Sequence, residues 1–173
     1  MKEHVLFICT HNSARSQMAE AFLREMYGNR FEAKSAGIDP KGVHPLAVDA
    51  MREIGIDISG QRSKSLLEFR DESFDVVVTV CDHARESCPF FPGGKQQLHK
   101  GFEDPSSFSG SEEEVLVKFR EVRDSLKKWI EELFIEKATR SDFSVKAKEL
   151  WFNKQNTIIN LMLFMFDYFF CLR

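Results

Sequence analysis

In the first half of the chain, short apolar runs alternate with segments whose apolar residues recur every three or four positions. The run His4–Ile8 is almost continuously apolar, which is typical of a buried parallel strand. In the segment Gln17–Tyr27, apolar residues recur four positions apart and predict a helix with one buried face. A second short strand, ended by Gly37, is predicted over Phe31–Ala36.

The same alternation continues along the chain. Pro45 suits the first position of a helix that Gly55 ends, and the β-branched run Asp75–Val80 predicts a third buried strand. A short fourth strand is expected around Leu98. A capping box then opens a final helix over Ser111–Leu133.

This order predicts an α/β fold with three layers, in which helices cover a small parallel sheet of about four strands. Ligands of such sheets bind at the carboxyl ends of the strands. Cys9 and Cys81 each directly follow a predicted strand, so we expect both at that edge. Two cysteines far apart in the sequence would then be close enough for a disulfide.

The chain changes character near its end, which predicts a catalytic domain over residues 1–137 and an apolar extension, expected to be helical, over residues 138–173. Within the extension, Thr157–Leu172 is apolar but interrupted by Asp167, and is too short and broken for a membrane span of about 20 residues. Three interpretations stay open: a helix docked on the domain, a partner-binding or interfacial helix, and an extension without selected function. Membrane contact is not favoured, and Cys171 is interpreted as a bystander.

Composition narrows the function classes. The formal net charge is −3, with acidic and basic residues interspersed, so no basic stripe for nucleic acid is expected. The amino terminus lacks the apolar core and cleavage site of a signal peptide, which favours a cytoplasmic protein. In a reducing compartment, the four cysteines are more often catalytic or metal-binding than structural.

A loop between the first strand and the first helix predicts an oxyanion site. Successive backbone N–H groups of such a loop point into one concavity, at the positive end of the helix dipole. This field is expected to lower the pKa of Cys9 below the free value of about 8.5, and Arg15 offers a planar fork to two oxygens of an anion. The oxyanion-binding residues are expected to be Thr10, His11, Asn12, Ser13, Ala14, Arg15 and Ser16, after the nucleophile Cys9.

A second pair of thiols, Cys81 and Cys88, is seven positions apart. In a helix their α-carbons would be about 10 Å apart, so a disulfide between them requires the helix to unwind. Pro89 marks the far end of this polar segment. Zinc binding with the flanking His83 and His99 is an alternative, but the cysteine spacing does not suit a structural zinc site.

Three thiols are enough for a reductive relay. If Cys9 attacks a reducible oxyanion, Cys81 can attack the adduct and expel the reduced product. Cys88 then transfers the disulfide to Cys81–Cys88, which an external dithiol can reduce. Expelling hydroxide needs a proton donor, and Asp104 is the best candidate because it follows the fourth strand at the same sheet edge.

Three motifs together resemble the thioredoxin-coupled arsenate reductases, which share the low-molecular-weight protein tyrosine phosphatase fold. These motifs are Cys9–Ser16, Val78–Pro89 and Gly101–Pro105. The resemblance implies that arsenate, or phosphate or sulfate as mimics, binds in the first motif. It also implies that thioredoxin or a similar dithiol protein recycles the enzyme. No metal and no organic cofactor are expected.

The chain departs from this family at a potassium site. Members that bind potassium use positions matching Asn12, Glu20 and Ser35, together with an aspartate. Lys64 stands where that aspartate would be. An ammonium could replace the metal cation, so we expect no potassium requirement.

Two other functions stay open. A tyrosine phosphatase or phosphomonoesterase would need only Cys9, Arg15 and Asp104, and weak activity of this kind is expected in any case. A non-catalytic redox sensor would use the disulfide between Cys81 and Cys88 to report oxidation.

Overall fold

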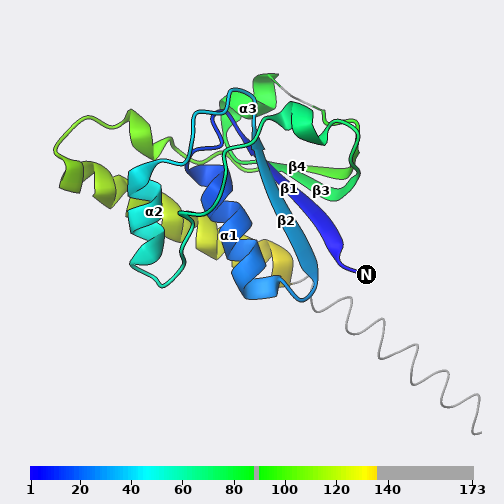
Figure 1. Cartoon of the computed structure of the whole chain (residues 1–173), viewed down its shortest axis with the longest axis horizontal. Helices are drawn as coiled ribbons and strands as arrows, with labels where there is room; N and C mark the ends of the chain where they lie inside the picture. The colour runs from blue at the N-terminus through cyan, green and yellow to red at the C-terminus, as the bar shows by residue number, and fades with distance from the viewer. Residues whose placement is uncertain (88–89, 136–173) are drawn as a thin grey trace, which may run out of the picture. The chain divides into compact units, whose positions relative to one another are not determined.

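The computed structural model describes residues 1–87 and 90–135, which contain a parallel sheet of four strands flanked by helices (Figure 1). The sheet order is β2-β1-β3-β4, and the three adjacent strand pairs are all parallel. The strands are β1 (Glu3–Cys9), β2 (Phe31–Gly37), β3 (Phe74–Thr79) and β4 (Gly94–His99). The predicted fold class is therefore confirmed, including the short fourth strand.

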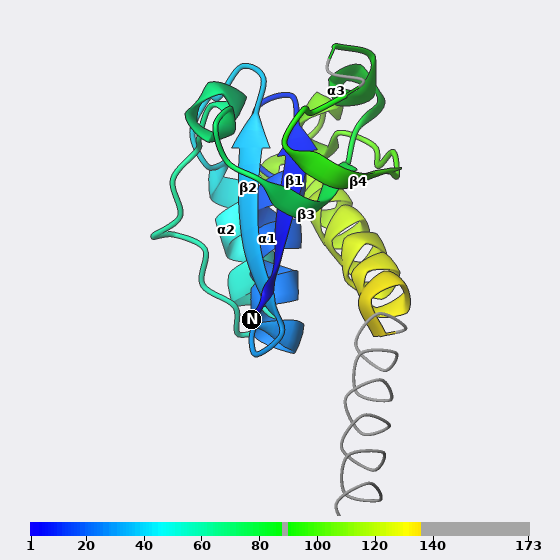
Figure 2. The ribbon, with the colours of Figure 1, turned by 90° about the vertical axis from the view of Figure 1, so that its right-hand side faces the viewer.

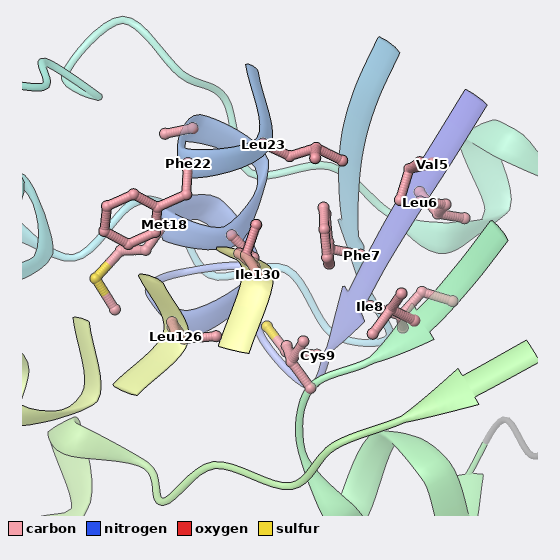
Figure 3. Packing of buried hydrophobic residues seen from close by; sticks show 14 of the residues in the cluster. Val5, Leu6, Phe7, Ile8, Cys9, Met18, Phe22, Leu23, Leu126 and Ile130 are labelled. Carbon is pink, nitrogen blue, oxygen red and sulfur yellow. The ribbon is translucent and has the colours of Figure 1, made fainter. Parts of the chain in front are cut away.

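The first helix, α1 (Arg15–Tyr27), and the helix over residues 112–135 pack on the sheet. Phe134 makes edge-to-face contacts with Phe7 of β1 and Phe31 of β2, at ring-centroid distances of 6.3 and 5.0 Å. Figure 3 shows side chains from β1, α1 and the helix over residues 112–135 in one apolar cluster, which includes Cys9. The nucleophile candidate thus lies at the border of the hydrophobic core.

The remaining helices are short. They are α2 (Pro45–Arg52), the 3-10 helix η1 (Leu66–Phe69), α3 (Asp82–Ser87) and the 3-10 helix η2 (Pro105–Ser107). The arrowheads of β1 and β2 in Figure 2 point to the end of the sheet where α3 lies. The carboxyl ends of the strands and the segment that follows β3 therefore meet at one edge.

Most predicted boundaries differ from the structure by a few residues. The first helix begins at Arg15 rather than Gln17, and α2 ends at Arg52, before the predicted stop at Gly55. The predicted capping box is present, since Ser111 Oγ accepts from the backbone N–H of Glu114, whose carboxylate accepts from the N–H of Ser111.

Several sequence-based predictions fall on residues that the structure does not describe. They concern Cys88, Pro89, Cys171 and the extension over residues 138–173, and the predicted domain boundary also lies there. Residues Met1–Phe134 form a compact unit. In the described ranges, no helix combines the length and the apolar character that crossing a membrane requires.

Candidate active site

The loop after β1 encloses the thiol of Cys9. Cys9 is the last residue of β1 and only 2% exposed. The backbone N–H of Asn12 donates to Cys9 Sγ at 3.1 Å, and Ser16 Oγ lies 2.9 Å from the same sulfur. The chain therefore turns around the sulfur and contacts it from both the loop and the first turn of α1.

The side chain of Asn12 fixes the shape of this loop. Asn12 has a φ of 47°, a left-handed conformation that asparagine adopts more readily than most residues. Its Nδ2 donates to Ser16 Oγ and Ser35 Oγ at 2.8 and 2.9 Å. Its Oδ1 accepts from Gln17 Nε2 and from the backbone N–H of Lys64, at 2.9 and 2.7 Å. Asn12 is completely buried, so these four hydrogen bonds satisfy both ends of its amide.

Gly37, at the end of β2, lets the loop approach the sheet closely. A β-carbon at this position would lie 2.8 Å from the backbone N of Asn12 and 2.9 Å from the carbonyl carbon of His11. Both of these atoms belong to the backbone, so a side chain at position 37 would displace the loop.

We expect Gly37→Ala to lower the free energy of unfolding by about 2 kcal/mol, because overpacking a rigid site forces backbone shifts. Anion binding should weaken as well, since the displaced residues belong to the loop. Urea denaturation and phosphate titration measure the two effects. Gly60→Ala is the matched control, because nothing lies within 4 Å of its added β-carbon. Equal stability of both variants would contradict this account.

Arg15 and Asp104 meet beside the loop. Arg15 Nη2 contacts Asp104 Oδ2 at 2.6 Å, and Nη1 donates to the carbonyl oxygen of Phe102 at 2.9 Å. The Arg15 side chain is only 8% exposed. Its buried Nε has no hydrogen-bond partner among the described residues. The guanidinium therefore keeps a donor for a further acceptor, which suits an oxyanion site.

Asp104 also caps η2. Its Oδ1 accepts from the backbone N–H and the hydroxyl of Ser106, at 3.1 and 2.7 Å, while Oδ2 faces Arg15. The two oxygens thus have separate partners, which orient the carboxyl group. The structure brings the predicted acid and the predicted anion-binding arginine into direct contact.

The electrostatic state of Cys9 differs from the sequence-based expectation. Burial raises the pKa of the Cys9 thiol, and the neighbouring Cys81 acts in the same direction. The hydrogen bonds with Ser16 and the charge of Arg15 lower this pKa, but burial outweighs them. The predicted lowering of the Cys9 pKa is therefore wrong, because the thiol lies against the hydrophobic core.

The second cysteine lies close to the first loop. Cys81 directly precedes α3 and is buried, and its Sγ is 3.3 Å from Thr10 Oγ1. Thr10 directly follows Cys9 in the sequence. Cys81 therefore contacts the residue next to Cys9. Both described cysteines are free thiols. The third thiol of the predicted relay, Cys88, lies outside the described residues.

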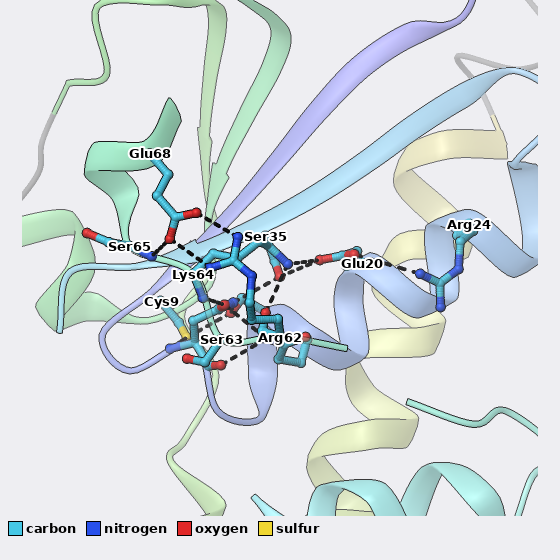
Figure 4. Close-up of polar contacts among 12 residues, drawn as sticks. Cys9, Glu20, Arg24, Ser35, Arg62, Ser63, Lys64, Ser65 and Glu68 are labelled. Carbon is cyan, nitrogen blue, oxygen red and sulfur yellow. Dashed lines mark hydrogen bonds and ion pairs between the residues drawn. The ribbon is translucent and has the colours of Figure 1, made fainter. Parts of the chain in front are cut away.

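The residues at the predicted cation position form a polar cluster (Figure 4). Lys64 Nζ donates to Glu20 Oε2 at 3.2 Å, and the same oxygen accepts from Ser35 Oγ. Arg24 lies 3.7 Å from the other oxygen of Glu20. The ammonium of Lys64 therefore neutralises a largely buried carboxylate whose partner Ser35 also holds Asn12.

The described residues contain no cluster of side chains that is suited to bind a metal ion. In the part of the chain that the structure describes, no group of three or more histidine, cysteine, aspartate or glutamate residues lies close enough to hold a metal ion. His99, considered for zinc, contacts Thr79 and Asp82 instead.

Two contributors to the site were not found from the sequence. Gln17 Nε2 donates to both the carbonyl and the side-chain oxygen of Asn12, and Gly37 makes room for the loop. The signal for Gln17 was weak, because a polar residue at the start of a helix is normally exposed. Gly37 was interpreted only as the end of a strand.

A cysteine in a loop between a strand and a helix, with an arginine and a carboxyl group beside it, is the arrangement expected of phosphatase-like enzymes. A model of the low molecular weight phosphotyrosine protein phosphatases matches residues 4–146, so the chain belongs to this family. The family predicted from the three sequence motifs is confirmed.

Within this family, the chain is similar in sequence to several arsenate reductases. An arsenate reductase of Halalkalibacterium halodurans is 46% identical over 129 residues, which cover 75% of this chain and 93% of that protein. One from Bacillus subtilis is 43% identical and covers 70% of this chain and 88% of its own length. A solved arsenate reductase in its oxidized state matches with a TM-score of 0.67 and 34% identity, covering 78% of this chain and 98% of the other. A low molecular weight protein tyrosine phosphatase from T. tengcongensis matches with a TM-score of 0.63 and 28% identity, covering 78% and 99%.

Proposed function

We propose that the protein reduces arsenate to arsenite by a relay of three cysteine thiols that thioredoxin recycles. The observation that carries the proposal is the contact of Cys81 with Thr10, the residue after Cys9. A phosphatase needs a single thiol in its anion loop, whereas a second thiol beside that loop suits reductive chemistry. The arsenate reductases at up to 46% identity support the same activity.

The first step joins arsenic to sulfur. The loop amides and Arg15 bind the arsenate oxygens, and the Cys9 thiolate attacks the arsenic atom. A hydroxide leaves as water after it takes a proton from Asp104, which is acting as general acid. Since burial raises the pKa of Cys9, the thiol passes its proton to an oxygen of the bound arsenate as it attacks, and Arg15 and Ser16 favour the ionised form.

The second step transfers the electrons. The thiolate of Cys81 attacks the sulfur of Cys9, the sulfur–arsenic bond breaks, and its electron pair stays on arsenic, which leaves as arsenite. A Cys9–Cys81 disulfide remains. Cys88 then attacks Cys81 and frees Cys9, and the dithiol of thioredoxin reduces the resulting Cys81–Cys88 disulfide.

The test is a coupled assay with arsenate, thioredoxin, thioredoxin reductase and NADPH. We expect one NADPH to be oxidised for each arsenite formed, and no oxidation when thioredoxin is omitted. The phosphatase alternative uses the same Cys9, Arg15 and Asp104. Rapid hydrolysis of phenyl phosphates without arsenate-dependent NADPH oxidation would favour it and refute the reductase proposal.

We expect potassium not to stimulate the protein, because the ammonium of Lys64 already lies against Glu20. Replacing sodium by potassium at constant ionic strength should leave arsenate turnover unchanged within about twofold. Lys64→Met removes this charge and should lower turnover, since the largely buried Glu20 then has only the more distant Arg24, at 3.7 Å, as a cationic partner. A clear increase in wild-type activity with potassium would contradict the prediction.

A further inference from the structure

His99 connects the two segments on either side of Cys81. It is the last residue of β4, and its Nδ1 lies 2.8 Å from Thr79 Oγ1 at the end of β3. Its Nε2 lies 2.9 Å from Oδ1 of Asp82, the first residue of α3. Cys81 lies between these two contacts in the sequence. The imidazole therefore bridges the strand before the second thiol and the helix after it.

The chemistry of the partners fixes a proton on this ring. An ionised carboxylate only accepts hydrogen bonds, so the contact with Asp82 requires a proton on Nε2 of His99. On the other side, the Thr79 hydroxyl can accept from Nδ1–H or donate to Nδ1, and it also lies 3.4 Å from the carbonyl oxygen of Leu98. His99 can therefore keep its hydrogen bonds to Thr79 and Asp82 whether or not Nδ1 carries a proton. In both cases the hydrogen bond to Asp82 involves a charged carboxylate.

Asp82 lies at the surface, with 80% of its side chain exposed, and contacts the loop after β4. A β-carbon on Gly101 would lie 2.6 Å from Asp82 Oδ1, so the carboxylate packs directly against the loop after β4. The same loop is tied to β3, because the N–H of Lys100 donates to the Thr79 carbonyl and the N–H of Phe102 donates to that of Val80. Asp82 is thus attached to a part of the structure that is itself fixed to the sheet.

We propose that His99 is a positioning residue for the second thiol: it holds the first turn of α3 against the sheet edge and so keeps Cys81 beside Thr10. The helix itself is short, since it ends at Ser87, and short helices are marginal without tertiary contacts. A contact at its first residue therefore has a large influence on whether Cys81 stays buried. The expected effect on the relay rests on the proposed function, but the placement of Cys81 does not.

Four variants test the contact between His99 and Asp82: two keep it and two remove it. In His99→Gln, the amide nitrogen takes the approximate place of Nε2 and keeps the contact with Asp82. In His99→Asn, it takes the place of Nδ1 and loses that contact. Asp82→Asn keeps an acceptor for Nε2–H, whereas Asp82→Ala does not. Glu86→Ala is the matched control, because it removes an exposed acidic residue from the same helix.

The first readout is alkylation of each thiol by iodoacetamide, resolved by peptide mass spectrometry. We expect alkylation of Cys81 to become up to about fivefold faster in His99→Asn and Asp82→Ala, the effect of losing one solvent-exposed charged contact. It should change less than about twofold in the other variants. Alkylation of Cys9 should not change. Equal rates at Cys81 in all variants would overturn the proposal.

The second readout is formation of the Cys9–Cys81 disulfide by arsenate, with Cys88→Ser present in every variant. We expect this rate to fall up to about fivefold in His99→Asn and Asp82→Ala, while hydrolysis of para-nitrophenyl phosphate stays the same. If hydrolysis falls equally, His99 supports the whole fold and the proposal is wrong. If wild-type Cys81 and Cys9 form no disulfide with arsenate, the proposed function fails, and the alkylation rates still decide the role of His99.

Discussion

Replacing Cys88 by serine is expected to stop arsenate reduction after one turnover per chain. In the proposed relay, Cys9 and Cys81 should suffice to form arsenite, and Cys81 Sγ lies 3.3 Å from the hydroxyl of Thr10, the residue that follows Cys9. Without Cys88, the oxidised enzyme should stop at the Cys9–Cys81 disulfide. Both cysteines are buried, so the dithiol of another protein has little access to either sulfur. Steady-state turnover with thioredoxin should therefore fall by at least about 10²-fold, whereas hydrolysis of para-nitrophenyl phosphate by the reduced variant should not change.

The measurement compares a burst with a steady state. Quenched-flow assays of arsenite should show a burst of one equivalent for Cys88→Ser, followed by almost no further product. Cys171→Ser is the matched control, since it removes another cysteine near the end of the chain and should leave turnover unchanged. Cys81→Ser should abolish even the burst. Sustained turnover of Cys88→Ser with thioredoxin would show that a different thiol completes the relay.

The sheet was predictable because its strands have unambiguous local patterns. β1 and β3 each contain an uninterrupted apolar run, Val5–Cys9 and Val76–Val78, as expected of strands buried on both faces. β4 was harder to predict, because it is an edge strand whose residues are largely exposed. Only Leu98 marked its position. The end of α2 was also misplaced, since Gly55 lies in the loop beyond the helix.

The anion loop was predictable for a different reason. Cys9 and Arg15 belong to one continuous segment between a strand and a helix, so local order alone places them together. The pKa of Cys9 was not predictable in this way, because Cys9 is buried in a core cluster that also contains residues from the far end of the domain, such as Leu126 and Ile130 (Figure 3). The same limit applies to His99, whose partners Thr79 and Asp82 are distant in the sequence.

Asp104→Asn is expected to lower the rate of steps that expel a poor leaving group by about 10³-fold, because general acid catalysis typically contributes 10²–10⁴-fold. The asparagine oxygen can still accept from the backbone N–H of Ser106, so the cap of η2 is retained. What the variant loses is the carboxyl group that faces Arg15 and that can carry and donate a proton. Arsenate expels hydroxide and phenyl phosphate expels phenolate, so both reactions should slow strongly.

Leaving-group dependence distinguishes a proton donor from a residue that only orients Arg15. Para-nitrophenolate leaves readily without a proton, so Asp104→Asn should affect para-nitrophenyl phosphate at least about tenfold less than phenyl phosphate. Glu103→Gln, the adjacent exposed carboxylate, serves as the control and should leave both rates unchanged. Equal losses on the two substrates would assign Asp104 to the orientation of Arg15. A difference between them would mean that this carboxyl group contacts Arg15 in the resting site and, once protonated, donates that proton to the leaving group.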